Sequence, residues 1–193
     1  MKKLYLLGDS IRMGYESSVK QKMAGLADVF SPAVNCEFAQ FTLRHMHEWA
    51  EQIKCQNEID LVHWNNGLWD TARLFGDECL TPPDVYADML GRIYKRIRIV
   101  FPNAKVIFAL STPVLEERYD RAKFFRLNRD IREYNSIASR VMNELNVEVN
   151  DLYSIAANFT VSQYADVTHF TKEGYNILAG AIVKLCEVYL RNS

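Results

Sequence analysis

Ser10 is the first residue whose type and position could do chemistry. It stands in Gly8-Asp9-Ser10, directly after an apolar run, where a strand would pass into a helix. A hydroxyl at that point lies beside the free backbone N–H groups and the positive end of the helix, which favour a developing negative charge. Serine is also a good helix cap, so its position alone leaves both a nucleophile and a structural cap open.

A serine nucleophile needs a base, and the chain has four histidines. His45 and His47 are two residues apart on a predicted helix and therefore diverge, and His63 falls inside a predicted strand. His169 lies in a predicted loop before the last helix, three residues after Asp166. A carboxylate so placed can orient the imidazole while its other nitrogen faces a serine.

The elements that must position these residues alternate between short apolar runs and longer amphipathic stretches. We expect strands at Lys3–Leu7, Ala33–Phe38, Ile59–Trp64, Lys105–Leu110 and Val147–Val149. We expect helices at Ile11–Gly25, Thr42–Cys55 with Thr42 as N-cap, Asp84–Phe101, Phe124–Leu145 and Thr171–Leu190. The pattern predicts one domain over residues 1–193, a flavodoxin-like three-layer α/β/α sandwich whose five-stranded parallel sheet carries helices on both faces.

Ligands of such sheets bind beyond the carboxyl ends of the strands. This rule selects the segments that follow each predicted strand: Gly8-Asp9-Ser10, Ala39-Gln40, Asn65-Asn66-Gly67, Ser111-Thr112-Pro113 and the residues before the last helix. The segments 69–83 and 113–126 should overhang the same edge. Their aromatic and charged residues suit the faces and hydroxyls of a sugar better than a long acyl chain.

Composition excludes several classes of protein. The 193 residues hold 23 Lys and Arg against 24 Asp and Glu, which argues against a nucleic-acid partner. No apolar run is long enough for a membrane span. Only four apolar residues stand between Lys3 and Asp9, so we expect no signal peptide and a cytoplasmic protein. The four cysteines form no metal-binding or redox motif, which predicts reduced thiols and no metal site.

Gly8-Asp9-Ser10 after the first strand, together with Asp166-x-x-His169 before the last helix, resembles the SGNH (GDSL-type) hydrolase superfamily. The resemblance extends over essentially the whole chain, whereas the G-x-S-x-G motif of ordinary α/β-hydrolases is absent. It implies Ser10 as nucleophile, His169 as base and Asp166 as the residue that orients His169. It implies no metal and no cofactor.

The oxyanion hole of that superfamily uses the backbone N–H of the serine, a glycine N–H and an asparagine side chain. Here Gln40 stands at the glycine position and Trp69 at the asparagine position. A backbone N–H of Gln40 can still donate, and we expect Asn65 to supply the side-chain donor. A surface glutamine and a strand-end cap are the plainer interpretations of Gln40 and Asn65.

Arg12, Asn66 and Trp69 are the remaining candidate substrate-binding residues. The sequence favours an esterase that removes short acyl groups, above all O-acetyl, from a small-molecule or oligosaccharide ester. A lipid-type acylhydrolase or lysophospholipase, a thioesterase, and a catalytically weak binding protein stay open. A nucleotide-binding flavodoxin-like domain is disfavoured because no glycine-rich phosphate loop follows the first strand. Whether the protein forms a homo-oligomer is left open.

Overall fold

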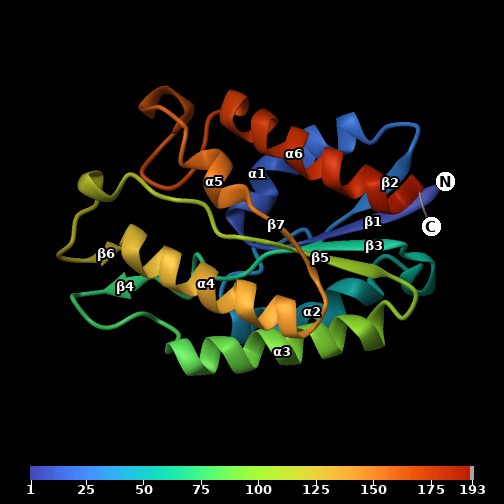
Figure 1. Ribbon diagram of the computed structural model, residues 1–193, viewed down its shortest axis with the longest axis horizontal. Helices are drawn as coiled ribbons and strands as arrows, with labels where there is room; N and C mark the ends of the chain where they lie inside the picture. Colours follow the sequence, from blue (N-terminus) through green and yellow to red (C-terminus); the bar gives the residue numbers. More distant parts are fainter. Residues whose placement is uncertain (192–193) are drawn as a thin grey trace.

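The computed structural model describes residues 1–191 and is built on a five-stranded parallel sheet (Figure 1). Its strands are β1 (Lys2–Leu7), β2 (Ala27–Phe30), β3 (Leu61–Trp64), β5 (Lys105–Ala109) and β7 (Glu148–Asn150). They lie in the order β2-β1-β3-β5-β7, and every neighbouring pair is parallel. All five carboxyl ends therefore meet at one edge of the sheet.

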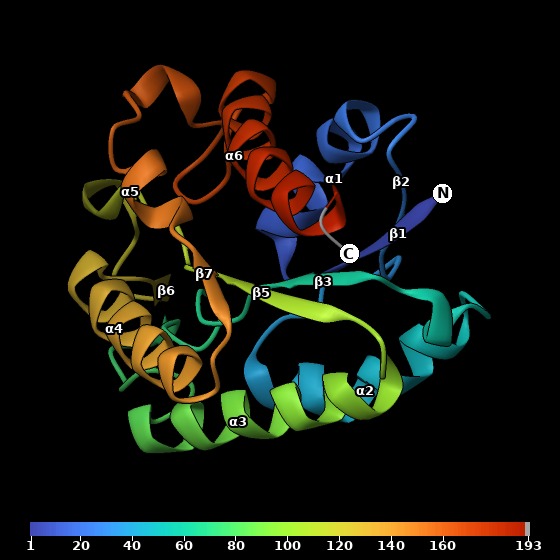
Figure 2. The same ribbon diagram turned by 45° about the vertical axis from the view of Figure 1, so that its right-hand side comes forward.

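Helices cover both faces of the sheet, as Figure 2 shows from the side. One face carries α1 (Ser10–Lys22), α5 (Leu152–Ala156) and α6 (Lys172–Arg191), and the other carries α2 (Ala39–Glu51), α3 (Pro83–Val100) and α4 (Asn128–Glu144). The predicted three-layer α/β/α architecture is confirmed.

Strand β1 shows why the sheet is buried on both sides. Its side chains alternate between two apolar clusters: Tyr5 and Leu7 pack beneath α2 and α3, whereas Leu4 and Leu6 pack beneath α1 and α6. All four are at most 1% exposed. Successive side chains of a strand point to opposite faces, so a strand covered on both faces reads as an unbroken apolar run.

The predicted strand over residues 33–38 is wrong. The second strand is β2 at Ala27–Phe30, an edge strand that pairs with β1 from Lys2 to Tyr5. Residues 33–38 instead form an irregular segment that runs beside Gly8, whose carbonyl accepts the N–H of Cys36 at 3.2 Å. Their apolar side chains suggested a strand, but Cys36 reaches the core from a loop.

Two predicted helix starts also need correction. Helix α2 begins at Ala39 rather than after Thr42, and the hydroxyl of Thr42 donates to the carbonyl of Cys36 at 2.7 Å instead of capping the helix. Helix α4 begins at Asn128 rather than at Phe124. The first residues of that predicted helix form strand β6 (Phe124–Phe125), which pairs in antiparallel fashion with β4 (Arg73–Leu74).

In residues 1–191, none of the helices combines the length and the apolar character that crossing a membrane requires.

Candidate active site

Ser10 is the first residue of α1, at the carboxyl end of β1. The preceding residue, Asp9, caps the helix: its Oδ1 accepts the N–H of Ile11 at 2.9 Å. The backbone N–H of Ser10 finds no acceptor within the described chain. Because Asp9 caps the helix, the hydroxyl of Ser10 is not used as a cap. The N–H of Ser10 stays free at the positive end of the helix.

The loop before α6 brings His169 to Ser10. The Nε2 of His169 lies 2.8 Å from the Oγ of Ser10, across 159 positions of sequence. The loop is closed by a hydrogen bond from the N–H of Ala165 to the carbonyl of His169 at 2.8 Å and by a bridge between Tyr164 and Phe170. The edge predicted from the carboxyl ends of the strands is thus where the hydroxyl and the imidazole meet.

Asp166 holds the imidazole from the other side. Its Oδ2 lies 2.7 Å from the Nδ1 of His169, and its Oδ1 accepts the backbone N–H groups of Thr168 and His169, both at 2.7 Å. Burial acts to raise the pKa of Asp166, but these hydrogen bonds outweigh it and keep the pKa below its usual value. The carboxylate stays charged at neutral pH and fixes the Nδ1–H tautomer of the histidine.

A cleft of about 410 Å³ opens over these three residues. Besides Ser10, Asp166 and His169 it is lined by Asn35, Trp69, Tyr119, Phe124, Arg126, Val167 and Thr168. The predicted overhang of the segments 69–83 and 113–126 matches this lining, since Trp69 comes from one and Tyr119, Phe124 and Arg126 from the other.

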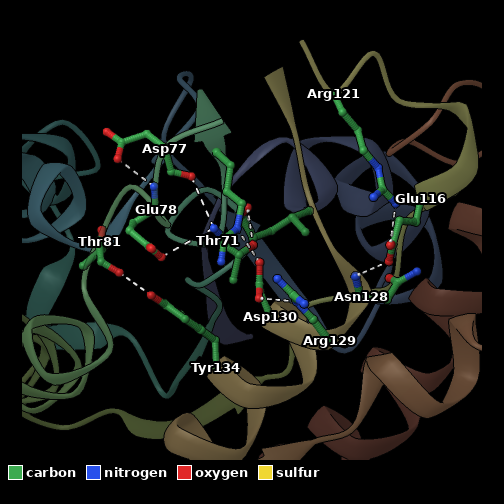
Figure 3. A network of polar contacts seen from close by, with 12 residues as sticks. Thr71, Asp77, Glu78, Thr81, Glu116, Arg121, Asn128, Arg129, Asp130 and Tyr134 are labelled. Atoms are coloured by element: carbon green, nitrogen blue, oxygen red, sulfur yellow. Dashed lines mark hydrogen bonds and ion pairs between the residues drawn. The ribbon is translucent and has the colours of Figure 1, made fainter. Parts of the chain in front are cut away.

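The two overhanging segments are fastened to one another and to the body of the protein. Strands β4 and β6 pair them directly, and the N–H of Phe75 donates to the carbonyl of Lys123 at 2.7 Å. Arg73, in the first of these segments, forms a 2.7 Å ion pair with Asp130 at the start of α4. Figure 3 shows the surrounding polar contacts: Tyr134 reaches Thr81, and Glu116 lies between Arg121 and Asn128.

The segment that carries Tyr119 also contacts the histidine loop. The N–H of Leu115 donates to the carbonyl of Val167 at 2.9 Å, and the hydroxyls of Tyr119 and Thr168 share a hydrogen bond. Through these contacts, one wall of the cleft and the loop that supplies His169 are held together.

Two of the predicted substrate residues have their polar groups occupied elsewhere. The guanidinium of Arg12 is buried against Glu16 at 2.5 Å and donates to the carbonyls of Gly8 and Val34. The side chain of Asn66 accepts from the indole of Trp64 at 2.6 Å and donates to the carbonyl of Glu37 and to Thr42. Neither residue lines the cleft, whereas the third candidate, Trp69, does.

The predicted oxyanion residues lie at the same edge of the sheet but differ in their surroundings. The side chain of Gln40 accepts a hydrogen bond from Thr81 at 3.2 Å, while its backbone N–H finds no acceptor within residues 1–191. Asn65 is buried beside Gly8, and its amide interacts with the carboxyl of Asp9. It does not line the cleft.

Asn35 is the lining residue that the sequence analysis missed. Its Oδ1 accepts the N–H of Glu37 at 2.9 Å, and its Nδ2 has no protein acceptor in the described part of the chain. Asparagine followed by a turn is a common pattern, and the signal was hidden because the segment reads as an apolar strand.

Two buried carboxyls lie beneath the edge. Burial raises the pKa of Asp9, although the nearby amide of Asn65 acts in the opposite direction. Burial also raises the pKa of Asp70, to about 6, and the N–H of Ala39, which donates to its Oδ1 at 3.1 Å, offsets this only in part. These carboxyls order the starts of α1 and α2, the helices that carry the free N–H groups of Ser10 and Gln40.

No protein-family model and no curated protein matches the chain. Solved structures do. A lipase/acylhydrolase from Enterococcus faecalis superposes with a TM-score of 0.78 at 22% identity and covers 99% of this chain and 97% of its own. A member of the lipolytic G-D-S-L family from Veillonella parvula gives 0.69 at 16% identity, covering 96% and 98%.

A carbohydrate acetylesterase from Sinorhizobium meliloti, Est24, gives a TM-score of 0.69 at 12% identity and covers 97% of this chain and 99% of its own. At these identities the likeness is one of fold. The resemblance inferred from Gly8-Asp9-Ser10 and Asp166-x-x-His169 is confirmed at that level, because GDSL-type lipases and esterases share this fold over nearly the full length.

Proposed function

We propose that the chain is an SGNH hydrolase, a serine esterase that removes short acyl groups, principally O-acetyl, from a carbohydrate or polyol. The observation that carries the proposal is the pair of contacts made by one imidazole, 2.8 Å to the Oγ of Ser10 and 2.7 Å to the carboxylate of Asp166. These distances are those required for a base that removes the proton of a serine while a carboxylate holds its tautomer.

The reaction would proceed in two steps. The Oγ of Ser10 attacks the ester carbonyl while His169 takes the hydroxyl proton, and the tetrahedral intermediate collapses as His169 returns that proton to the leaving alcohol. The acyl group is then bound to Ser10. Water, deprotonated by His169, attacks the acyl-enzyme and releases the carboxylic acid, which restores the serine.

The negative oxygen of each intermediate needs donors. The free N–H groups of Ser10 and Gln40 are the proposed backbone pair, both at the starts of helices where the helix dipole favours an anion. Asn65 is the side-chain donor inferred from the sequence. Asn35 is the second candidate, favoured by its unengaged Nδ2 and by its place in the cleft lining.

The dimensions and lining of the cleft support a short acyl group. A volume of about 410 Å³ has room for an acetyl ester of a sugar-sized alcohol, and its walls combine aromatic rings with hydroxyl and amide groups. Carbohydrate acetylesterases are among the proteins of the same fold. A lipase/acylhydrolase is also among them, so longer acyl chains and thioesters are the second candidate class.

The test is hydrolysis of para-nitrophenyl esters from acetate to palmitate by the wild type, Ser10→Ala and Ser17→Ala. Ser17 is an exposed serine of the same helix and serves as the control. We expect activity confined to acetate and propionate, a loss of at least about 10⁴-fold in Ser10→Ala, and no change in Ser17→Ala.

A maximum at eight carbons or beyond would move the assignment to the acylhydrolase class. Equal activity in Ser10→Ala and the wild type would refute the nucleophile. No turnover of any ester would favour a binding protein that retains the fold.

A further inference from the structure

Arg126 is a buried cation in the wall of the catalytic cleft. It directly follows β6 and is only 3% exposed, yet it lines the cleft together with Ser10 and His169. Its guanidinium carbon lies 4.8 Å from the ring centre of Phe124 and 5.5 Å from that of Trp69. Aromatic faces stabilise a guanidinium and hold it in place, but they do not neutralise its charge.

Arg126 differs from Arg12, which is also buried, and from the half-buried Arg73 in having no acidic partner. Arg12 pairs with Glu16 at 2.5 Å, and Arg73 pairs with Asp130 at 2.7 Å. The Nε of Arg126 donates to the carbonyl of Leu68 at 2.5 Å and its Nη1 to the hydroxyl of Tyr119 at 3.1 Å. Within residues 1–191, no carboxylate oxygen lies within 4.0 Å of it, and its Nη2 has no protein acceptor.

The carboxyls nearest to the cleft do not supply the missing charge. Asp166 lines the cleft, but both of its oxygens are engaged by the histidine loop. The charge of Arg126 acts on the buried carboxyl of Asp9, but the two residues form no ion pair. A buried cation is costly unless an anion and hydrogen bonds compensate it. The open side of the cleft is where such an anion can arrive.

We propose that Arg126 binds a carboxylate of the substrate, so that the ester hydrolysed is one whose alcohol part bears a carboxylate, as in an acylated sugar acid. This inference rests on the proposed esterase function, because the short acyl group occupies the site at Ser10 and leaves the alcohol part to meet the wall. A single guanidinium with one free edge matches a carboxylate of one charge. A phosphate monoester, with nearly two charges, would require a second cation, and Arg126 is the one Lys or Arg in the described cleft lining.

The experiment compares two acetate esters that differ in one charge, 4-acetoxybenzoate and its methyl ester. Arg126→Met removes the charge and keeps an apolar stem, Arg126→Lys keeps the charge, and Arg126→Gln keeps donors for the carbonyl of Leu68. Arg121→Met is the matched control. It removes a cation of the same segment that is exposed, pairs with Glu116 and does not line the cleft.

We expect the kcat/KM of Arg126→Met for the carboxylate ester to fall about tenfold to a hundredfold further than for the methyl ester, mainly through KM, as for a charge-assisted hydrogen bond. Arg126→Lys should recover part of the lost preference for the carboxylate ester, and Arg126→Gln should not. Arg121→Met should leave unchanged the ratio of kcat/KM for the carboxylate ester to kcat/KM for the methyl ester. In the wild type this ratio should decrease as the salt concentration rises.

An equal loss for both esters in Arg126→Met, with the same melting temperature, would overturn the proposal and assign Arg126 to the oxyanion or to loop positioning. The two hypotheses fail separately. If the wild type hydrolyses neither ester, the esterase function fails, and calorimetric binding of 4-hydroxybenzoate against its methyl ester still decides whether Arg126 selects a carboxylate. Equal binding of the two compounds by the wild type would refute that selection.

Discussion

Replacing Gly14 by alanine should push apart α1, which begins at Ser10, and α6, which follows the loop of His169. A Cβ built on Gly14 of α1 would lie 2.0 Å from the Cζ of Tyr175, in the first turn of α6. The ring would have to move by about 1.4 Å to reach ordinary van der Waals contact. Tyr175 also packs edge-to-face on Phe170, 5.6 Å between ring centres, and Phe170 directly follows His169.

The size of the effect follows from a competition between helix propensity and overpacking. Alanine is favoured over glycine inside a helix by about 1 kcal/mol. Forcing an extra methyl group into a packed contact costs about 1–3 kcal/mol, so Gly14→Ala should lower the free energy of unfolding. The kcat for para-nitrophenyl acetate should also fall, because displacement of the Tyr175 ring is passed to the histidine loop.

Two other helical glycines provide matched controls. Nothing lies within 4 Å of a Cβ built on Gly91 in α3 or on Gly180 in α6. Alanine at either position should raise the free energy of unfolding by about 1 kcal/mol, or the melting temperature by about 2–4 °C for a chain of this size. Combining Gly14→Ala with Tyr175→Leu should recover part of the lost stability in a double-mutant cycle.

The measurements are denaturant unfolding of each variant and initial rates on para-nitrophenyl acetate. An increase in stability for Gly14→Ala equal to that for Gly180→Ala would refute the close approach of α1 and α6. A loss of stability that Tyr175→Leu does not relieve would assign the cost to another neighbour.

Two further predictions concern carboxyl groups. The pKa of Asp70 is about 6 in the folded chain against an ordinary 3.8, so the folded state binds this proton more tightly than the unfolded state does. The stability of the wild type relative to Asp70→Asn should therefore fall by at most about 3 kcal/mol as pH rises from about 4 to about 6. The free energy of unfolding is measured by urea denaturation at each pH. A constant difference between the two proteins from about pH 4 to about pH 6 would contradict this prediction. Asp166→Asn should lower kcat by about 10²–10⁴-fold with little change in KM, since the amide no longer fixes the tautomer of His169. An unchanged kcat for para-nitrophenyl acetate at neutral pH would show that Asp166 has no such part.

The fold and the proximity of Ser10 to His169 could be predicted from the sequence. Buried parallel strands read as apolar runs, and the carboxyl ends of parallel strands share one edge. Residues placed directly after the first strand and directly before the last helix therefore meet there, although 159 positions separate them. This argument needs only the order of the elements.

Long-range side-chain pairing was out of reach. Arg12, a candidate substrate-binding residue, pairs with Glu16 one helical turn away, a spacing that the sequence does contain. In the sequence, Arg126 is one of several charged residues in segment 113–126, and nothing there distinguishes it from the others. Its lack of a partner depends on contacts such as that between Arg73 and Asp130, 57 positions apart, which local sequence does not reveal.

The short strands outside the centre of the sheet could not be predicted from the sequence either. Strand β2 has four residues of mixed polarity and pairs on one side only, so it carries little of the apolar signal that marks the central strands. Strands β4 and β6 have two residues each and depend on pairing between distant loops. Phenylalanine favours strands, but two residues are too few to show a strand pattern in the sequence.

The pairing of β4 with β6 has a consequence for how this site can change over evolutionary time. The two segments form one backbone-bonded unit, so an insertion in one of them shifts the register in which it pairs with the other. Grafting segment 69–83 from a relative without segment 113–126 would leave an unmatched strand beside the cleft. Changes of specificity should therefore be inherited as paired substitutions across the two loops, and a library that varies both together should yield more folded variants than one that varies either alone.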